Sequence, residues 1–468
     1  MVQPTKGNHL NSAQQKKLPV SAYFGYGAGQ VGGQILRDTP ALILPIYMTT
    51  VLGLDPAIGA LVILIAKIWV VIADPIAGVI SDKTNTRWGR RRPFILAGGL
   101  LAAISFLLLF FVPDIKDQAL FIYMTAIYLL LNTGFSMFSV PYLTMASEMS
   151  DDADERTTIL SFRNGALAVG LLIGGALAPE IISRAIQDYG QTAQQAYEWM
   201  ALALGSVIML STLWVFFGTR GSRGKPADEA TLPLLEQIKT AWANKPFVTL
   251  ITANIVQYIS AGIGYAGGLF FFAYAMGFGA QSFSVIAIWI VVICFSSIGS
   301  MPLLVWASKR WGKMPVYKWC LFLYAICIQF YWLADKDTMW IVWLIAGGIG
   351  LFNGGFILMS FSVLTDTINF DRIRSGISRE GALSSVYSAV DKVGNALGSA
   401  IFLVFLSFIG FVESSDGSMA PQSASVNTWI AFAYILVPAI LHLSSILILN
   451  RYKLEDYKIR PSKVDMVG

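Results

Sequence analysis

The sequence predicts an all-α membrane protein that crosses the bilayer with twelve helices, arranged in two halves of six. Three observations support this fold class. The composition is 55% hydrophobic and only 13% charged over 468 residues, which is far too apolar for a soluble globule. Twelve apolar segments are long enough to cross a hydrocarbon core of about 30 Å as helices. Two charged loop motifs also recur in the second half, as expected of a duplicated chain.

The apolar segments follow a polar stretch, residues 1–19, that lacks the short apolar core of a cleavable signal. We therefore expect the first span to stay attached. The segments are rich in Gly, Ala and Ser, which allow membrane helices to approach closely. Strands of a membrane barrel would be about half as long. The expected spans cover residues 21–53, 57–81, 93–113, 119–147, 160–184, 197–219, 246–275, 282–306, 316–334, 338–365, 382–412 and 427–450.

Basic residues gather in alternate loops, such as DKTNTRWGRRR at 82–92 and SKRWGKM at 308–314. The opposite loops carry almost no cations beyond Lys116, Arg184 and Lys336. Because basic loops are retained in the cytoplasm, both termini are predicted to be cytoplasmic. The predicted organisation is an N-terminal tail at 1–19, a six-helix half at 20–219, a polar linker at 220–245, a second half at 246–450 and a tail at 451–468.

Two loop motifs repeat between the halves. RWGRRRPF, which follows span two, is echoed by RWGKMPVY after span eight, and Trp88 and Trp311 are 223 positions apart. SEMSDDADERTTILSFRNG, after span four, is echoed by TDTINFDRIRSGISREG after span ten, and Glu148 and Asp366 are 218 positions apart. The agreement of the two offsets indicates a transporter built by duplication.

Other function classes lack their signals. The sequence has no Gly-x-Ser-x-Gly elbow, no Walker loop and no His or Cys cluster, so we expect neither an enzyme nor a metal site nor a resident cofactor. Cys294, Cys320 and Cys327 lie in apolar runs and are interpreted as packing residues. The formal charge of +5 is attributed to cytoplasmic loops rather than to nucleic-acid binding.

Three motifs carry a resemblance to a known family: DPIAGVISDKTNTRWGRRRP from Asp74, VPYLTMASEMSDDADERTTILSFR from Val140 and RSGISREG from Arg374. On these the chain resembles the major facilitator superfamily, and within it the glycoside, pentoside and hexuronide cation symporters typified by melibiose permease. The resemblance covers nearly the whole chain. It implies the major facilitator fold and rocking of two six-helix halves around a midplane cavity.

Asp74 is the predicted coupling carboxylate, because an acid within an apolar span is costly and usually faces a cavity or a partner. The matching acid in the family belongs to the cation site. Sodium-using relatives have further oxygen ligands where this chain has Val70 and Ala73. A proton needs only one titratable group, so proton coupling is favoured, while sodium coupling or a loss of coupling stays open. The structural alternative is a pair with Lys67, two turns earlier on the same helix face.

Other polar residues within the predicted spans are candidates for the solute site. Arg163 matches the family's substrate-contacting arginine and Lys392 its intramembrane lysine, so that Asp391 and Lys392 are interpreted either as a structural pair or as partners of Asp74 or the solute. Gln34 and Ser139 stand where melibiose permease has sugar-binding acids. Because Gln34 and Ser139 lack the negative charge of those acids, the site is predicted to favour an acidic sugar.

Arg37 and Asp38 are adjacent in span one and so point to different faces. They are predicted either to bind solute hydroxyl groups, which need donors and acceptors, or to lock span one to another helix. The alternative for Arg163 is an anchor at the cytoplasmic end of its span.

The charged loops are predicted to act as a conformational switch, in which salt bridges form in one state and break in the other. The alternative is that these charges only determine the membrane topology, because their cations are attracted to anionic lipid headgroups and to the C-terminal ends of helices. The residues concerned are Asp82, Arg90, Arg91, Arg92, Glu148, Arg156, Asp366 and Arg379.

The sequence thus predicts a monomeric sugar or glycoside symporter of the inner or plasma membrane, with surrounding lipids as its other partners. One alternative is a carrier of a lysolipid or another amphipathic solute. A second is a sodium-coupled sugar symporter. A third, from another class, is a membrane sensor that transports nothing and gains no stability from a solute.

Overall fold

The structure is a computed structural model that describes residues 18–84, 86–150, 152–220, 242, 244–375, 380–417 and 419–453. The predicted linker therefore lies largely outside the described residues, as do most of both tails and Arg379. The N-terminal half consists of α1 (Val20–Thr50), α2 (Pro56–Lys83), α3 (Arg92–Phe110), α4 (Asp117–Met149), α5 (Ala153–Leu171), the π-helix η1 (Leu172–Leu177), α6 (Ala178–Gln187) and α7 (Ala193–Gly218).

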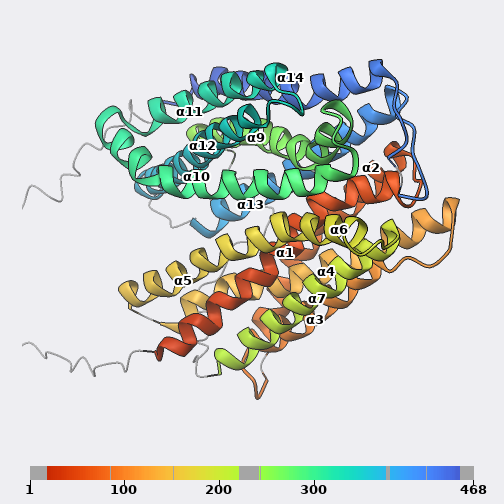
Figure 1. The fold of residues 1–468 in the computed structure, drawn as a ribbon. Helices are drawn as coiled ribbons and strands as arrows, with labels where there is room; N and C mark the ends of the chain where they lie inside the picture. Colours follow the sequence, from red (N-terminus) through yellow and green to blue (C-terminus); the bar gives the residue numbers. More distant parts are fainter. Residues whose placement is uncertain are drawn as a thin grey trace, which may run out of the picture.

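The C-terminal half consists of α9 (Lys245–Phe270), η2 (Phe271–Ala275), η3 (Gly279–Gln281), α10 (Ser282–Trp311), α11 (Lys313–Cys327), η4 (Ile328–Leu333), α12 (Met339–Ser375), α13 (Glu380–Phe408) and α14 (Ala424–Leu449). Figure 1 shows the two halves as separate bundles that meet along α2 and α13. Among the described residues, eleven helical segments are long and apolar enough to span a membrane. The twelfth, α1, has 31 residues but carries several polar side chains in its middle. The predicted twelve-helix fold is confirmed.

Helix boundaries follow local chemistry. Asp55 caps α2 by accepting a hydrogen bond from the backbone N–H of Ala57, with Pro56 at the first helical position. Thr192 and Gln195 form a capping box at the start of α7. Gly312, at φ 90°, separates α10 from α11. The helices of spans five and ten, α5 and α12, are longer than the predicted segments. Apolar residues mark only the part of a helix that lies in lipid, whereas its backbone hydrogen bonds continue beyond the membrane.

Close helix contacts within the C-terminal half depend on glycine. A Cβ added at Gly262 of α9 would stand 2.1 Å from the carbonyl oxygen of Asn395 in α13, and one at Gly398 would stand 2.0 Å from that of Ile259. No other residue fits at such distances. These contacts fix α13, and with it the charged residues at 391 and 392, against α9.

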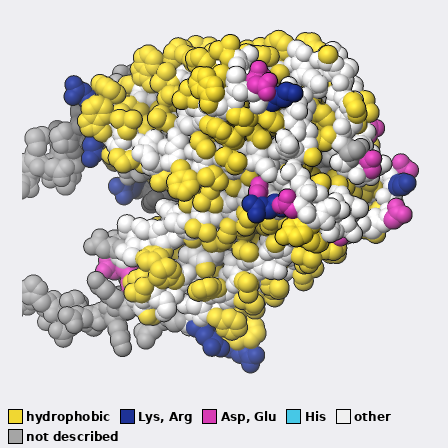
Figure 2. Space-filling view, viewed as in Figure 1, with side chains coloured by type: hydrophobic (Ala, Val, Ile, Leu, Met, Phe, Trp, Pro, Cys, Tyr) yellow, Lys and Arg dark blue, Asp and Glu magenta, His cyan; other side chains and the backbone are white. Residues whose placement is uncertain are grey.

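The two halves are joined at one end of the molecule and separate at the other. Here the terminal end means the end where Leu18 and Lys453 lie. One hydrophobic core cluster contains residues of both halves, whereas the two clusters nearest the terminal end belong to one half each. At the opposite end Ser414 N–H donates to the Thr49 carbonyl at 3.1 Å, and Ser284 Oγ donates to Ser183 Oγ at 2.8 Å. Figure 2 shows the surface hollowed between the halves toward the terminal end.

Candidate functional site

An ion pair between the halves lies at the centre of the candidate site. Asp74, in the middle of α2 before Pro75, accepts a hydrogen bond on Oδ2 from Lys392 Nζ of α13. Both side chains are about three-quarters buried, at 23% and 24% exposed. The other oxygen, Asp74 Oδ1, is buried and has no hydrogen-bond partner among the described residues. This second oxygen is therefore the one left to accept a proton.

The alternative pairing of Asp74 with Lys67 is wrong for this structure. Lys67 Nζ instead donates to Asn132 Oδ1 of α4 at 3.2 Å and lies 5.3 Å from the ring centre of Tyr128. The prediction used helical spacing within α2 alone, and spacing cannot reveal a polar residue that a neighbouring helix presents. Lys392, from the other half of the chain, takes the place beside Asp74.

A second ion pair between the halves joins α1 to α13. Arg37 Nη2 donates to Asp391 Oδ2 at 3.1 Å, and Asn395 Nδ2 donates to Asp391 Oδ1 at 2.8 Å. The adjacent residues Asp391 and Lys392 were interpreted as a possible mutual pair, but each contacts a different N-terminal helix. Successive side chains of a helix point about 100° apart, so one turn of α13 contacts both α1 and α2.

A hydrogen-bonded ladder runs along α1 from a cation to a carboxylate. Arg163 Nε donates to Gln30 Oε1 at 2.9 Å, Gln30 Nε2 to Gln34 Oε1 at 3.2 Å, and Gln34 Nε2 to Asp38 Oδ2 at 2.7 Å. The spacing of four residues stacks these side chains on one face of the helix. Both amides point the same way, and such aligned chains strengthen one another.

The ladder changes two sequence-based interpretations. Gln34 was predicted to bind the solute, but its amide oxygen and nitrogen are both engaged within α1. Arg163 was placed at the start of span five, but α5 begins at Ala153, so Arg163 lies well inside the helix and faces α1. Asp38 is buried, whereas the side chain of its neighbour Arg37 is 51% exposed, as expected for adjacent helical residues.

The charges of the site are unevenly paired. Each of the carboxylates Asp38, Asp74 and Asp391 lies within 4 Å of a cation or accepts a hydrogen bond from an amide. Lys67 and Arg163, by contrast, donate to neutral amide oxygens, and neither has an acidic partner within the described part of the chain. The four cations Arg37, Lys67, Arg163 and Lys392 thus exceed the three carboxylates of the site by one positive charge. Ser139 is half-buried on α4 and forms no side-chain hydrogen bond to the described part of this site.

The charged loop near the terminal end of the N-terminal half forms a compact network. Arg90 Nη2 and Arg91 Nε both bind Glu148 Oε1, at 2.7 and 2.9 Å, and Arg91 Nη1 lies 2.5 Å from Asp82 Oδ1. Arg92 differs from the prediction, because it donates to the backbone carbonyls of Phe216 and Trp88 rather than to an acid. This cation stabilises the end of α7 by capping its carbonyls.

The second half repeats the bridge. Lys313 Nζ binds the carboxylate of Asp366 at 2.7 Å, and these residues stand at the offsets of 223 and 218 positions from Arg90 and Glu148. Each of these loop ion pairs connects elements of the same half. Arg156 lies half-buried near the start of α5.

Sequence reasoning missed two amides, Asn132 and Asn395, and treated Lys67 only as a neighbour of Asp74. The available signal was that each is a polar residue within an apolar span, and that Asn395 stands one turn after Asp391.

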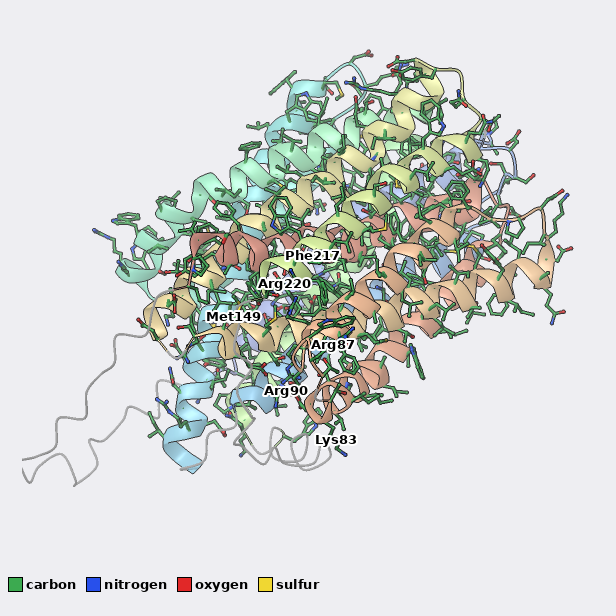
Figure 3. The ribbon with its side chains drawn as sticks, turned by 90° about the horizontal axis from the view of Figure 1, so that it is seen from below. Lys83, Arg87, Arg90, Met149, Phe217 and Arg220 are labelled. Carbon is green, nitrogen blue, oxygen red and sulfur yellow. The ribbon has the colours of Figure 1, made fainter. Side chains whose placement is uncertain are left out.

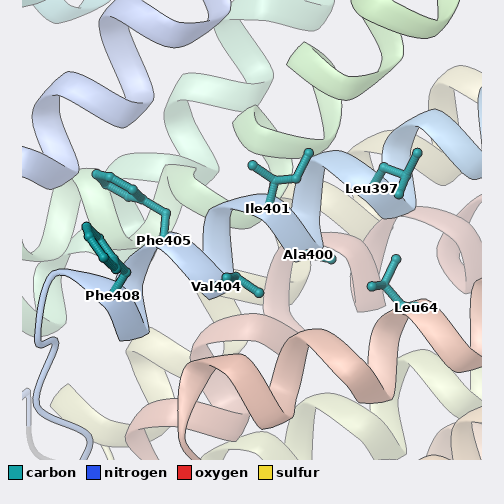
Figure 4. Close-up of a pocket in the computed structure, with 7 residues that line it drawn as sticks. All are labelled: Leu64, Leu397, Ala400, Ile401, Val404, Phe405 and Phe408. Carbon is teal, nitrogen blue, oxygen red and sulfur yellow. The ribbon is translucent and has the colours of Figure 1, made fainter.

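A separate groove between α2 and α13, with a volume of about 410 Å³, does not belong to this polar site (Figure 4). It is lined only by the apolar residues Leu64, Leu397, Ala400, Ile401, Val404, Phe405 and Phe408, so it offers no side-chain donor or acceptor to a sugar. The described residues contain no group of three His, Cys, Asp or Glu side chains that could hold a metal ion.

Comparison with known proteins assigns the family. Residues 25–456 match the model of the family described as "MFS/sugar transport protein". The chain belongs to this family. Its members are membrane transporters, and the chain is accordingly an integral membrane protein with the major facilitator fold.

Similar proteins share the whole length of the chain. The isoprimeverose transporter of Lactiplantibacillus pentosus is 23% identical, with 98% of this chain and 92% of the relative covered. The glucuronide carrier protein homolog of Escherichia coli strain K12 is 24% identical, with 96% of each covered. The crystal structure of the nucleoside transporter NupG superposes with a TM-score of 0.65 over 92% of this chain and 100% of that one, at 15% identity, which supports the fold.

Proposed function

We propose that this protein is a sugar or glycoside symporter that couples uptake to a proton through Asp74. The observation that carries the proposal is the ion pair between Asp74 and Lys392, which joins α2 of one half to α13 of the other. Protonation of Asp74 neutralises its carboxylate, so the attraction to Lys392 is lost. A proton bound at this position therefore changes the free energy of contact between the two halves, which is what coupling requires.

The environment of Asp74 favours a proton over sodium. Hard cations take several oxygen ligands, but Asp74 Oδ2 already binds Lys392, and the buried residues Val70 and Ala73 supply no side-chain oxygen. A proton needs only the single unpartnered oxygen, Asp74 Oδ1. Sodium coupling is the alternative that the experiment below separates.

The halves meet at the end opposite the termini, so with cytoplasmic basic loops this structure is the inward-open form. In that form Asp74 is paired with Lys392. The order that follows is release of solute and proton toward the cytoplasm, followed by formation of the ion pair in the empty carrier. Both steps need only rocking of the two halves, because the loop bridges remain within each half.

The solute favoured by the site is a glycoside with a carboxylate. The site holds one more cation than carboxylate, with Lys67 and Arg163 bound only to neutral amides among the described residues, and protonation of Asp74 raises this excess to two positive charges. A uronate would balance this positive charge, and its hydroxyl groups would find donors and acceptors nearby. The similarity to a glucuronide carrier homolog supports the same class. A lysolipid is the alternative that the apolar groove between α2 and α13 would suit, because its lining offers only apolar side chains.

Uptake into proteoliposomes tests the proposal. Purified protein is given methyl β-D-glucuronide or methyl β-D-glucoside, with either a pH gradient or a sodium gradient imposed. We expect accumulation of the glucuronide under the pH gradient, inside alkaline. Asp74→Asn should retain exchange of solute between equal concentrations but lose accumulation. Asp337→Asn, which removes a carboxylate from an exposed loop, is the matched control and should accumulate normally.

Each alternative predicts a different result. Accumulation driven by sodium at equal pH contradicts proton coupling, and full accumulation by Asp74→Asn removes Asp74 from the mechanism. Preference for the neutral glucoside contradicts the acidic-sugar assignment while leaving symport intact. A sensor would show no uptake and no thermal stabilisation by either glycoside, whereas a carrier gains stability with ligand concentration.

A further inference from the structure

Three basic side chains at the terminal end of the N-terminal half are not used by the loop network. Lys83 ends α2, Arg87 follows in the α2–α3 loop, and Arg220 follows the end of α7. All three are exposed, and none forms an ion pair within the described part of the chain. Figure 3 shows all three at this end of the bundle, with Lys83 farther from Arg220 than Arg87 is. Unlike Arg90, which is bound to Glu148, they present free positive charge.

Aromatic rings connect these cations into one surface. The guanidinium of Arg87 lies 5.0 Å from the ring centre of Trp88, and that of Arg220 lies 5.6 Å from the ring centre of Phe217. Between them Trp88 and Phe217 both pack against Phe216, with ring centres 5.6 and 5.3 Å apart. The result is a strip of three rings with an arginine at each end.

The strip is held in place from inside the protein. Arg92 donates from Nε to the carbonyl oxygen of Phe216 at 3.0 Å and from Nη1 to that of Trp88 at 3.2 Å. Its guanidinium also lies 4.5 Å from the ring centre of Phe216. One buried cation thus fixes both the loop and the end of α7, so the outer arginines are attached to a rigid base.

We propose that this surface, made of Lys83, Arg87, Trp88, Phe217 and Arg220, binds the phosphate headgroup of an anionic phospholipid. All five residues lie at helix ends, which is the depth of the headgroups in a bilayer. Guanidinium groups bind phosphate with two parallel hydrogen bonds. Trp88 and Phe217 are 45% and 53% exposed; the amphipathic ring of Trp88 is favoured at the membrane interface, and Phe217 adds an exposed apolar face.

The aromatic strip is what selects a lipid over a soluble anion. A free phosphate or a nucleic-acid backbone gains from the three positive charges but leaves the exposed faces of Trp88 and Phe217 in water. A phospholipid places its glycerol and upper acyl chains against these rings while its phosphate binds an arginine at one end of the strip. A phospholipid therefore contacts both the arginines, through its phosphate, and the exposed rings, through its apolar part.

Lipid retention by the purified full-length protein tests the site. Native mass spectrometry would compare binding of phosphatidylglycerol and phosphatidylcholine to the parent protein and to the Arg87→Gln, Arg220→Gln double variant. Each basic residue near an anionic lipid strengthens binding about fivefold. We therefore expect the double variant to bind phosphatidylglycerol about 25-fold more weakly, with phosphatidylcholine little changed. Replacing both arginines by Lys keeps the charge but loses the paired hydrogen bonds, so it should restore only part of the binding.

A matched control removes two exposed cations from the opposite end, by Lys116→Gln and Lys336→Gln. It should bind phosphatidylglycerol like the parent. An equal loss in both double variants would mean general surface electrostatics, and no loss in either would mean that the arginines do not bind lipid; both results overturn the site. Displacement of the lipid by soluble glycerol 3-phosphate at similar concentration would instead assign the surface to a free phosphate.

Discussion

The ion pair between Arg37 and Asp391 should favour the form in which the halves separate at the terminal end. It joins α1 to α13 across the two halves, and Asn395 supports the carboxylate from one turn away. The perturbation is a double-mutant cycle of Arg37→Gln, Asp391→Asn and the two combined. Each single change leaves one charge without its partner, whereas the double variant removes both charges with little change in shape.

The size of the effect follows from distance and exposure. At 3.1 Å and an effective dielectric constant of about 20, two unit charges attract by about 5 kcal/mol. Solvent reduces this value, because the Arg37 side chain is 51% exposed and that of Asp391 is 18% exposed. Fully exposed pairs contribute about 0.2–1 kcal/mol, and loss of one partner from a buried pair costs about 3–5 kcal/mol. We expect about 1–2 kcal/mol, equivalent to a shift of about 5- to 30-fold in the equilibrium between states.

Pulsed electron paramagnetic resonance measures that equilibrium. Spin labels at Lys83 and Lys309, which lie exposed near the same end of different halves, report the distance between the halves in a background without the native cysteines. Each single variant should populate a shorter distance, and the double variant should show less change than the sum of the two. Unchanged distances in all variants would refute the idea that this pair biases the conformation.

Three further perturbations test the packing that supports the site. Gln34→Leu should destabilise the folded protein by about 1.5–3 kcal/mol, measured as a lower melting temperature, because it leaves the buried Asp38 carboxylate without its amide donor; an unchanged melting temperature would contradict the ladder. Gly262→Ala should lower the melting temperature, because its Cβ would clash with a backbone carbonyl of α13, while Gly264→Ala, with nothing within 4 Å, serves as control. Glu148→Gln should lower the melting temperature but leave the rate of exchange between states, seen in counterflow, little changed, because its bridges lie within one half; a changed exchange rate would mean that this network acts as a conformational switch.

The fold was predictable because the bilayer imposes simple rules. Hydrophobic segments of sufficient length and alternate basic loops locate helices without any knowledge of their packing. The twelve predicted spans each overlap a helix of the structure. The ends were less predictable, because the helical path of α12 continues to Ser375, ten residues past the apolar segment. Hydrogen bonding along the backbone, rather than apolarity, determines where such a helix stops.

The site was predictable residue by residue but not contact by contact. Asp74, Arg37, Asp391 and Lys392 were all identifiable as charges in apolar spans, since such charges are rare and need a partner. Their partners lie more than three hundred positions away in the sequence, and no local spacing specifies which helices will be neighbours. The ladder on α1 is the exception, because its spacing of four residues is a property of the helix itself.

Internal duplication explains which contacts should stay fixed and which should change during transport. The bridges of Glu148 and Asp366 occur once in each half and join elements within it, so rocking of the halves need not break them. The ion pairs that Asp74 and Asp391 form with Lys392 and Arg37 are not repeated in this way. At the offset of 223 positions, for example, Asp74 corresponds to Ser297.

Because the two unrepeated ion pairs cross between the halves, any relative movement of the halves must change their geometry. At the opposite end, the polar contacts between halves that the described residues form are hydrogen bonds rather than ion pairs: Ser414 donates to the Thr50 carbonyl and Ser407 donates to the Asp55 carboxylate, and such bonds contribute about 1–3 kcal/mol each. Within the polar contacts of the described residues, the charge-dependent part of the conformational equilibrium is thus concentrated at α13. A proton or a charged solute bound there acts directly on the contacts that distinguish the two states.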